Sequence, residues 1–127
     1  MDIVIVISCL LIPVIMIISG YLMKAKTPKK INGIYGYRTE RSMKNKETWN
    51  FANKLCGDIW LKVGLIMLII SAVITAIISI NKDENAFAVA SIVILLVQTI
   101  ILIATIVPVE KALRNKFDED GNPKEKQ

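Results

Sequence analysis

Residues 86–109 read AFAVASIVILLVQTIILIATIVPV and contain no charged residue. An α-helix rises about 1.5 Å per residue, so about 20 residues cross the roughly 30 Å hydrocarbon core of a bilayer. Residues 3–23 and 63–81 are likewise long, apolar and uncharged. The alternative, a buried helix of a soluble protein, is rarely as long or as uniformly apolar. We therefore predict three transmembrane helices, at about 3–23, 60–80 and 86–109.

Ile and Val are abundant in all three stretches, and in water these residues favour strands. In lipid an open strand leaves backbone groups without hydrogen-bond partners, so a helix is favoured instead. The stretches also lack the alternation of apolar and polar residues that is typical of a transmembrane barrel. The predicted fold class is all-α.

The chain carries a formal net charge of +5, and many of its bases lie between the first and second spans. Between positions 24 and 46 the chain has one acid, Glu40, and eight bases. The bases are Lys24, Lys26, Lys29, Lys30, Arg38, Arg41, Lys44 and Lys46. The positive-inside rule places this loop, residues 24–46, in the cytoplasm. We expect a multi-pass protein with its N-terminus outside and its C-terminus in the cytoplasm. In this setting the positive charge indicates contact with membrane lipids and not direct binding of nucleic acid.

The first apolar stretch has two interpretations, a cleaved signal peptide or a retained helix. No base precedes it, and no small-residue cleavage site follows it. We expect the helix to be retained. The two cysteines, Cys9 and Cys56, fall at different depths on this topology, so we expect them to be unpaired residues of helix contacts.

The second helix is expected to begin before the membrane. Asn45 is a good N-cap residue, and Glu47 places a negative charge in the first turn, where the helix dipole favours it. Residues 46–62 are amphipathic and extend the second span at its cytoplasmic end. Trp60 and Lys62 are interpreted as anchors at the membrane interface.

The last segment, residues 111–127, mixes acids and bases and shows no apolar periodicity in its second half. We predict a disordered cytoplasmic tail. The chain then divides into a membrane domain, residues 1–110, and this tail.

Small and polar residues recur every seven positions in the second and third helices, which places each set on one helix face. Such residues let helices approach closely in lipid and form hydrogen bonds between them. The sets are Gly57, Gly64 and Ser71, and Ser91, Gln98 and Thr105. The favoured interpretation is packing inside one three-helix bundle. A pore lined by the second set is the alternative.

Residues 32–53 read NGIYGYRTERSMKNKETWNFAN, a mixture of glycines, tyrosines, arginines and hydroxyl residues before an amphipathic helix. Arg38 and Arg41 are suited to lipid phosphates or to the carboxylates of a partner. Thr39 and Ser42 are suited to capping nearby backbone groups. Composition alone favours a basic loop held to anionic lipid.

The order of these residues resembles the signature of the SdpI/YfhL family of bacterial membrane proteins. The matching positions are Gly36, Arg38, Thr39, Ser42, Met43, Asn45, Trp49, Ala52 and Asn53. The resemblance implies a location in the bacterial plasma membrane. It also implies immunity against a secreted peptide toxin, and signalling in which the toxin-bound protein holds a cytoplasmic repressor at the membrane. The candidate site residues are Gly36, Tyr37, Arg38, Thr39, Arg41, Ser42, Asn45, Trp49 and Asn53, with Arg38, Thr39 and Arg41 expected to face a partner.

Other functions fit the sequence less well. The chain has no histidine, and no nucleophile–base pair or paired carboxylates are visible, so we expect no enzyme, no cofactor and no metal site. The cores of the spans lack ionisable residues, which argues against an ion relay. The main alternative to immunity is a membrane scaffold or receptor that recruits a soluble factor through the basic loop without binding a toxin.

Overall fold

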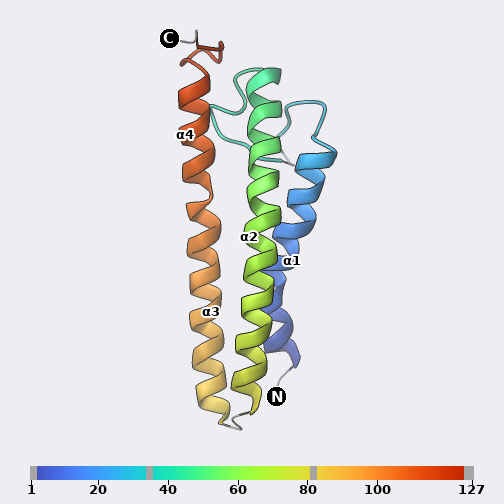
Figure 1. Cartoon of the computed structure of the whole chain (residues 1–127), viewed down its shortest axis with the longest axis vertical. Helices are drawn as coiled ribbons and strands as arrows, with labels where there is room; N and C mark the ends of the chain where they lie inside the picture. Colours follow the sequence, from blue (N-terminus) through green and yellow to red (C-terminus); the bar gives the residue numbers. More distant parts are fainter. Residues whose placement is uncertain (1–2, 34–35, 81–82, 125–127) are drawn as a thin grey trace.

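The computed structural model describes residues 3–33, 36–80 and 83–124, and this part of the chain contains four helices (Figure 1). They are α1 (Ile3–Ala25), α2 (Lys46–Ile80), α3 (Glu84–Ala104) and α4 (Ile106–Lys116). α3 and α4 follow one another as a nearly continuous rod, and α2 packs against this rod and against α1. The prediction of an all-α fold with three apolar segments long enough to cross a membrane is confirmed.

Helix α2 runs without interruption from the loop into the apolar region, as predicted. Asn45 caps it: the Asn45 Oδ1 atom accepts the backbone N–H of Thr48 at 2.9 Å. In return, the Thr48 hydroxyl oxygen accepts the N–H of Asn45 at 3.1 Å. This reciprocal pair satisfies backbone donors that the helix itself leaves free. It therefore fixes where the loop ends and α2 begins.

The third apolar segment, predicted as a span over residues 86–109, lies within Glu84–Lys116, which is long and apolar enough to cross a membrane. α3 ends at Ala104, and α4 begins at Ile106 after a turn at Thr105. Pro108 explains the break, because its missing N–H cannot bond to the carbonyl of Ala104 and its ring crowds that carbonyl. Proline is tolerated near the start of α4, where the backbone N–H groups have no intrahelical partner anyway.

Helices α1 and α2 approach most closely where two glycines face each other. A Cβ atom built on Gly57 would lie 2.6 Å from the carbonyl oxygen of Gly20, and one on Gly20 would lie 2.8 Å from that of Gly57. Two helical turns further along α2, Gly64 faces Pro13 and Met16 of α1. Because lipid tails are as apolar as the side chains, such close van der Waals packing is what holds helices together in a membrane.

A single glutamine links all three apolar segments. Pro13 lacks an N–H, so the carbonyl of Cys9, four residues earlier in α1, has no backbone partner within the helix. The Gln98 Nε2 group of α3 donates to this carbonyl at 2.7 Å and to the Ser71 hydroxyl of α2 at 2.8 Å. Gln98 is 2% exposed. The amide therefore satisfies the backbone group that the proline leaves free.

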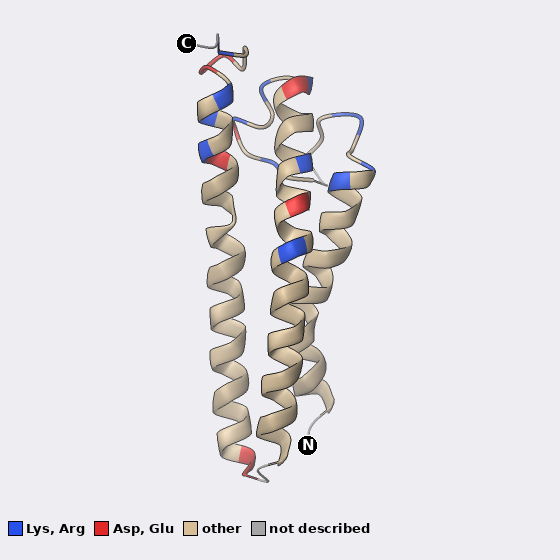
Figure 2. Ribbon diagram, viewed as in Figure 1, with Lys and Arg blue, Asp and Glu red and all other residues tan. Residues whose placement is uncertain are grey.

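The charges separate along the bundle (Figure 2). Lys and Arg gather where α1 ends, α2 begins and α4 lies, which we call the basic end, whereas Asp83 and Glu84 lie at the opposite end. At the basic end, Lys24 of α1 and Lys62 of α2 both pair with Asp58, at 2.7 and 2.9 Å. Between the two ends, large Ile, Leu and Val side chains are exposed along each helix, as expected for contact with lipid.

The prediction of a disordered tail over residues 111–127 is corrected for residues 111–124. Helix α4 continues to Lys116, and the chain then turns back so that Phe117 pairs with Pro123. Val109, Leu113 and Phe117 are spaced by four residues and pack together with a buried cluster at the basic end. The rest of this cluster is Met23, Tyr37, Ala52 and Cys56. An apolar stripe of α4 thus orders a segment whose overall composition is polar.

Candidate functional site

The loop between α1 and α2 folds back onto α2 through the side chains that resemble the family signature. The Ser42 hydroxyl, which is fully buried, accepts the N–H of Thr39 at 2.8 Å and lies 3.0 Å from the carbonyl of Tyr37, to which it donates. The Thr48 hydroxyl donates to the carbonyl of Ser42 at 3.0 Å. These bonds tie residues 37–42 to the first turn of α2, because buried polar groups that find partners hold a loop in one conformation.

A second group of contacts holds the part of the loop nearer to α1. Asn53 is fully buried; its Oδ1 accepts the N–H of Tyr37 at 2.7 Å, and its Nδ2 donates to the carbonyl of Trp49 at 2.8 Å. The Trp49 indole N–H donates to the carbonyl of Pro28 at 2.9 Å. Asn53 and Trp49 therefore connect α2 to the loop at two separate points.

Gly36 is required where the loop passes over this asparagine. Its φ is +106°, a conformation that side chains with a Cβ rarely adopt. A Cβ atom here would also lie 2.6 Å from Asn53 Oδ1 and 3.1 Å from the Trp49 ring. The glycine thus allows the backbone to approach α2 closely enough for the Tyr37 N–H to reach Asn53.

A third contact joins the loop to α4. Glu110 Oε2 accepts the Tyr37 hydroxyl at 3.0 Å and the Thr39 hydroxyl at 3.2 Å. Burial, and then the neighbouring Glu110 carboxylate, raise the pKa of the Tyr37 phenol above its ordinary value, so the phenol remains a hydrogen-bond donor. We call the folded segment of residues 36–48, held by Asn53 and Glu110, the loop cap.

The two arginines of the loop cap make none of the contacts described above that hold the cap to α2 and α4. Arg38 is exposed, and its guanidinium donates to the carbonyl of Gly33. Arg41 is half-buried. Of the nine candidate residues, Gly36, Tyr37, Thr39, Ser42, Asn45, Trp49 and Asn53 take part in contacts that fold the cap. Arg38 and Arg41 are therefore the candidates that the cap presents.

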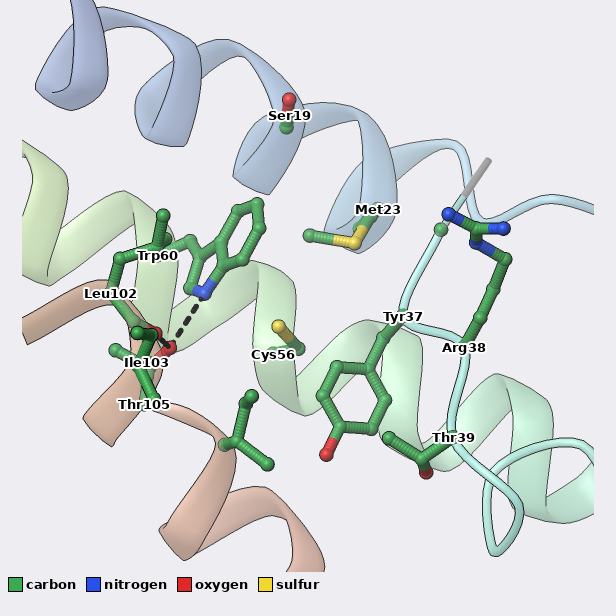
Figure 3. A pocket seen from close by; sticks show the side chains of 12 residues that line it. Ser19, Met23, Tyr37, Arg38, Thr39, Cys56, Trp60, Leu102, Ile103 and Thr105 are labelled. Atoms are coloured by element: carbon green, nitrogen blue, oxygen red, sulfur yellow. Dashed lines mark hydrogen bonds between the residues drawn. The ribbon is translucent and has the colours of Figure 1, made fainter. Parts of the chain in front are cut away.

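A cleft of about 460 Å³ lies beside the loop cap, between α1 and the junction of α3 and α4 (Figure 3). Met23 of α1, which packs in the buried cluster with Val109 and Leu113 of α4, forms part of one wall of this space. Tyr37, Arg38 and Thr39 lie at one end of the cleft, and Trp60 and Leu102 lie toward the other (Figure 3). Ser19, Met23, Gly36, Cys56, Ile103, Thr105 and Ile106 complete its lining.

The described residues of the two seven-residue repeats are buried and take part in contacts within or between helices. Gly57 and Gly64 face α1, and Ser71 accepts from Gln98. The Ser91 hydroxyl donates to the carbonyl of Phe87 in its own helix. Thr105 accepts the indole N–H of Trp60 at 3.0 Å. Trp60 therefore joins α2 to the α3–α4 junction in addition to lying near the expected interface.

Sequence reasoning missed three residues of this arrangement. Thr48 is buried and caps α2; its position three residues after the N-cap is the local signal that reveals it. Glu110 holds the loop cap from a distance of more than seventy residues, and no local pattern marks it. Gly20 faces Gly57, but it belongs to no repeat within its own helix.

The described residues offer no group of three or more His, Cys, Asp or Glu side chains that is placed to hold a metal ion. Cys9 and Cys56 are both buried and free. What the fold and the site define is a small helical membrane protein with a structured loop at its basic end.

The chain belongs to the SdpI/YfhL protein family, whose family model matches residues 29–109. This match includes the loop cap, all of α2 and α3, and the start of α4. The uncharacterized protein YfhL of Bacillus subtilis (strain 168) is 45% identical over 53 residues. That similarity covers 42% of this chain and 48% of YfhL, so the chain matches about half the length of this relative. No solved structure matches the chain at a significant level.

Proposed function

We propose that this protein is a bacterial membrane immunity protein that gives resistance to a secreted peptide toxin by binding it. The observation that carries the proposal is the family match, because it extends over the loop cap as well as over the spans. The cap supports it physically: seven of the nine candidate residues hold a rigid frame, and Arg38 is left exposed on that frame. A fixed frame reduces the entropy lost when a partner binds, which favours a recognition site.

We also propose that the basic end lies in the cytoplasm of a bacterial cell, with the N-terminus outside. Figure 2 supports this orientation, since Lys and Arg gather at one end of the bundle and the loop at the other end contains Asp83 and Glu84. In this orientation the toxin arrives from the side of the α2–α3 turn, and the loop cap faces cytoplasmic proteins.

The cytoplasmic partner that fits the loop cap is a repressor protein with an acidic surface. Arg38 and Arg41 carry guanidinium groups suited to bidentate contacts with carboxylates. Thr39 lies between them in the chain, but its hydroxyl is engaged with Glu110. In the proposed signalling step, the toxin-bound immunity protein holds this repressor at the membrane through the arginines.

Survival under toxin challenge tests the proposal. The protein is expressed in a toxin-sensitive bacterium, which is then exposed to secreted membrane-active peptide toxins. Arg38→Ala, Lys29→Ala and an empty vector are compared at equal membrane abundance. Lys29→Ala is the matched control, because it removes one exposed base from the same loop without altering the cap.

We expect wild type and Lys29→Ala to protect and Arg38→Ala to protect less. Unchanged protection in Arg38→Ala would indicate that the protective surface lies outside the loop cap, on the spans or the α2–α3 turn. Failure of the wild type against every toxin would contradict immunity.

A scaffold or receptor without a toxin is the second candidate. The basic end favours it, because exposed bases from the loop, α2 and α4 cover this end, among them Lys44, Lys54 and Lys111. Pull-down from a cytoplasmic extract in the absence of toxin separates the two functions. A specific soluble protein that is retained by wild type, lost in Arg38→Ala and unaffected by toxin would favour the scaffold.

A further inference from the structure

We propose that the cleft beside the loop cap binds one acyl chain of an anionic phospholipid from the surrounding bilayer, with the lipid phosphate at Arg38. The inference concerns the resting protein in its membrane. It does not depend on immunity or on recruitment of a repressor.

The walls of the cleft have the chemistry that an acyl chain requires. Most of its length is lined by apolar side chains, those of Met23, Trp60, Leu102, Ile103 and Ile106. The Thr105 hydroxyl, which also lines it, is already used, since it accepts from Trp60 and donates to the carbonyl of Leu102. A volume of about 460 Å³ falls within the range of pockets that hold small molecules, roughly 300–1,000 Å³.

The cleft continues into the surface that faces lipid. Ile103 is 60% exposed and Ile106 is 42% exposed, and both line the cleft while belonging to the apolar outer face of the bundle. The space between α1 and the α3–α4 junction therefore opens sideways. An acyl chain can enter from the hydrocarbon without crossing water, which favours a bilayer lipid over a soluble ligand.

The polar end of the cleft carries the charge that complements a phosphate. Arg38 is exposed and lines the cleft; one of its five N–H donors is used by the carbonyl of Gly33. Glu110 does not line the cleft, and its Oε2 accepts the Tyr37 and Thr39 hydroxyls. A phosphodiester thus meets an unburied guanidinium with free donors.

Fluorescence quenching by brominated lipids tests this proposal, because Trp60 lines the cleft. The purified full-length protein is placed in phosphatidylcholine vesicles that contain a small, equal fraction of either dibromo-phosphatidylglycerol or dibromo-phosphatidylcholine. Trp60→Phe measures the background from Trp49, the second tryptophan of the chain. Arg38→Gln removes the guanidinium, Lys29→Gln is the charge-matched control, and Ser19→Phe fills the cleft from α1.

We expect dibromo-phosphatidylglycerol to quench Trp60 more strongly in the wild type, with an apparent preference of about fivefold, the effect of one base beside an anionic lipid. Arg38→Gln and Ser19→Phe should lose this preference, and Lys29→Gln should keep it. Equal quenching by the two lipids in the wild type would overturn the proposal. It would favour a peptide segment as the occupant of the cleft. An equal loss in Lys29→Gln and Arg38→Gln would overturn it as well, since it would show only general attraction to the charged surface.

Discussion

The apolar half of the bundle and its basic end are held together by different interactions. In the apolar half, α2 packs on α1 through Gly64, and Gln98 supplies the hydrogen bonds between segments. At the basic end, hydroxyl, amide and carboxylate groups hold the loop cap, and a cluster of buried side chains lies beneath it. Close van der Waals fit is what holds helices together in lipid, because lipid tails are as apolar as the side chains.

This difference indicates which residues are free for function. Side chains of the apolar half face either another helix or lipid. At the basic end, the same few residues that match the family signature build a frame, and the arginines are left on its surface. The four substitutions that follow test the two halves of the bundle separately, in order of decreasing expected effect.

Gly57→Leu should give the largest loss. Its Cβ would lie 2.6 Å from the Gly20 carbonyl oxygen and 2.7 Å from the Lys24 backbone nitrogen, and neither backbone atom can move without separating α1 from α2. We expect a loss of about 3 kcal/mol in the free energy of unfolding. Titration with sodium dodecyl sulfate, followed by far-ultraviolet circular dichroism, measures it. Ala76→Leu, at an exposed position of α2, is the control; equal stability of the two variants would contradict the close approach.

Gly36→Ala should break the loop cap while leaving the apolar half intact. The positive φ and the contact with Asn53 together should destabilise the cap by about 2 kcal/mol. Release of the cap exposes Trp49, so its emission should shift to longer wavelength in a Trp60→Phe background. Gly33→Ala is the control, because nothing lies within 4 Å of a Cβ built there. An unshifted emission in Gly36→Ala would show that the cap does not require this glycine.

Gln98→Leu should weaken the apolar half by about 1 kcal/mol, the typical size of hydrogen bonds between membrane helices. The loss is modest because Gln98 Oε1 is buried without a partner, and its removal offsets part of the two lost bonds. The same detergent titration measures it. Thr99→Val is the control, since that hydroxyl bonds only to its own helix, at Leu95. If both variants unfold alike, the link to the Cys9 carbonyl contributes nothing.

Tyr37→Phe should have the smallest effect, about 0.5–1 kcal/mol, because the Glu110 carboxylate is only partly buried and keeps the Thr39 hydroxyl as a donor. Because the pKa of folded Tyr37 is raised above its ordinary value of 10.0, the bond contributes fully below pH 10 and is lost as pH rises through the raised value. The stability difference between wild type and Tyr37→Phe should therefore shrink above pH 10. Unfolding titrations of both proteins between pH 7 and 11 measure it, and a difference that grows with pH would contradict the bond to Glu110.

The sequence alone predicts those structural elements whose signal lies in neighbouring residues. Hydropathy located the three apolar segments, and Asn45 with Glu47 marked the start of α2. The signal for an ordered α4 was also present, in the four-residue spacing of Val109, Leu113 and Phe117, but it was outweighed by the polar composition of the segment. The turn at Thr105 lies just before Pro108, a residue type that kinks or ends helices.

Contacts between distant segments were not predictable from the sequence. The bonds from Tyr37 to Glu110 and from Gln98 to the Cys9 carbonyl depend on the axial register of the helices, which hydropathy does not fix. Trp60 illustrates the same limit: its depth suggested an interface anchor, whereas its hydrogen bond to Thr105 depends on how α2 is rotated. The family signature marks the position of the loop cap in the sequence. The geometry of the cap is needed to distinguish the residues that build the frame from the residues that the frame presents.

The central claim is that the loop cap is a fixed frame and not a flexible basic tether. Hydrogen exchange of the protein in lipid nanodiscs tests this directly, with residues 37–43 compared with residues 29–33. The N–H groups of Tyr37, Thr39, Ser42 and Met43 all donate hydrogen bonds, so they should exchange slowly, and Asn53→Ala should accelerate them. Exchange in residues 37–43 as fast as in residues 29–33, in the wild-type protein, would contradict the account.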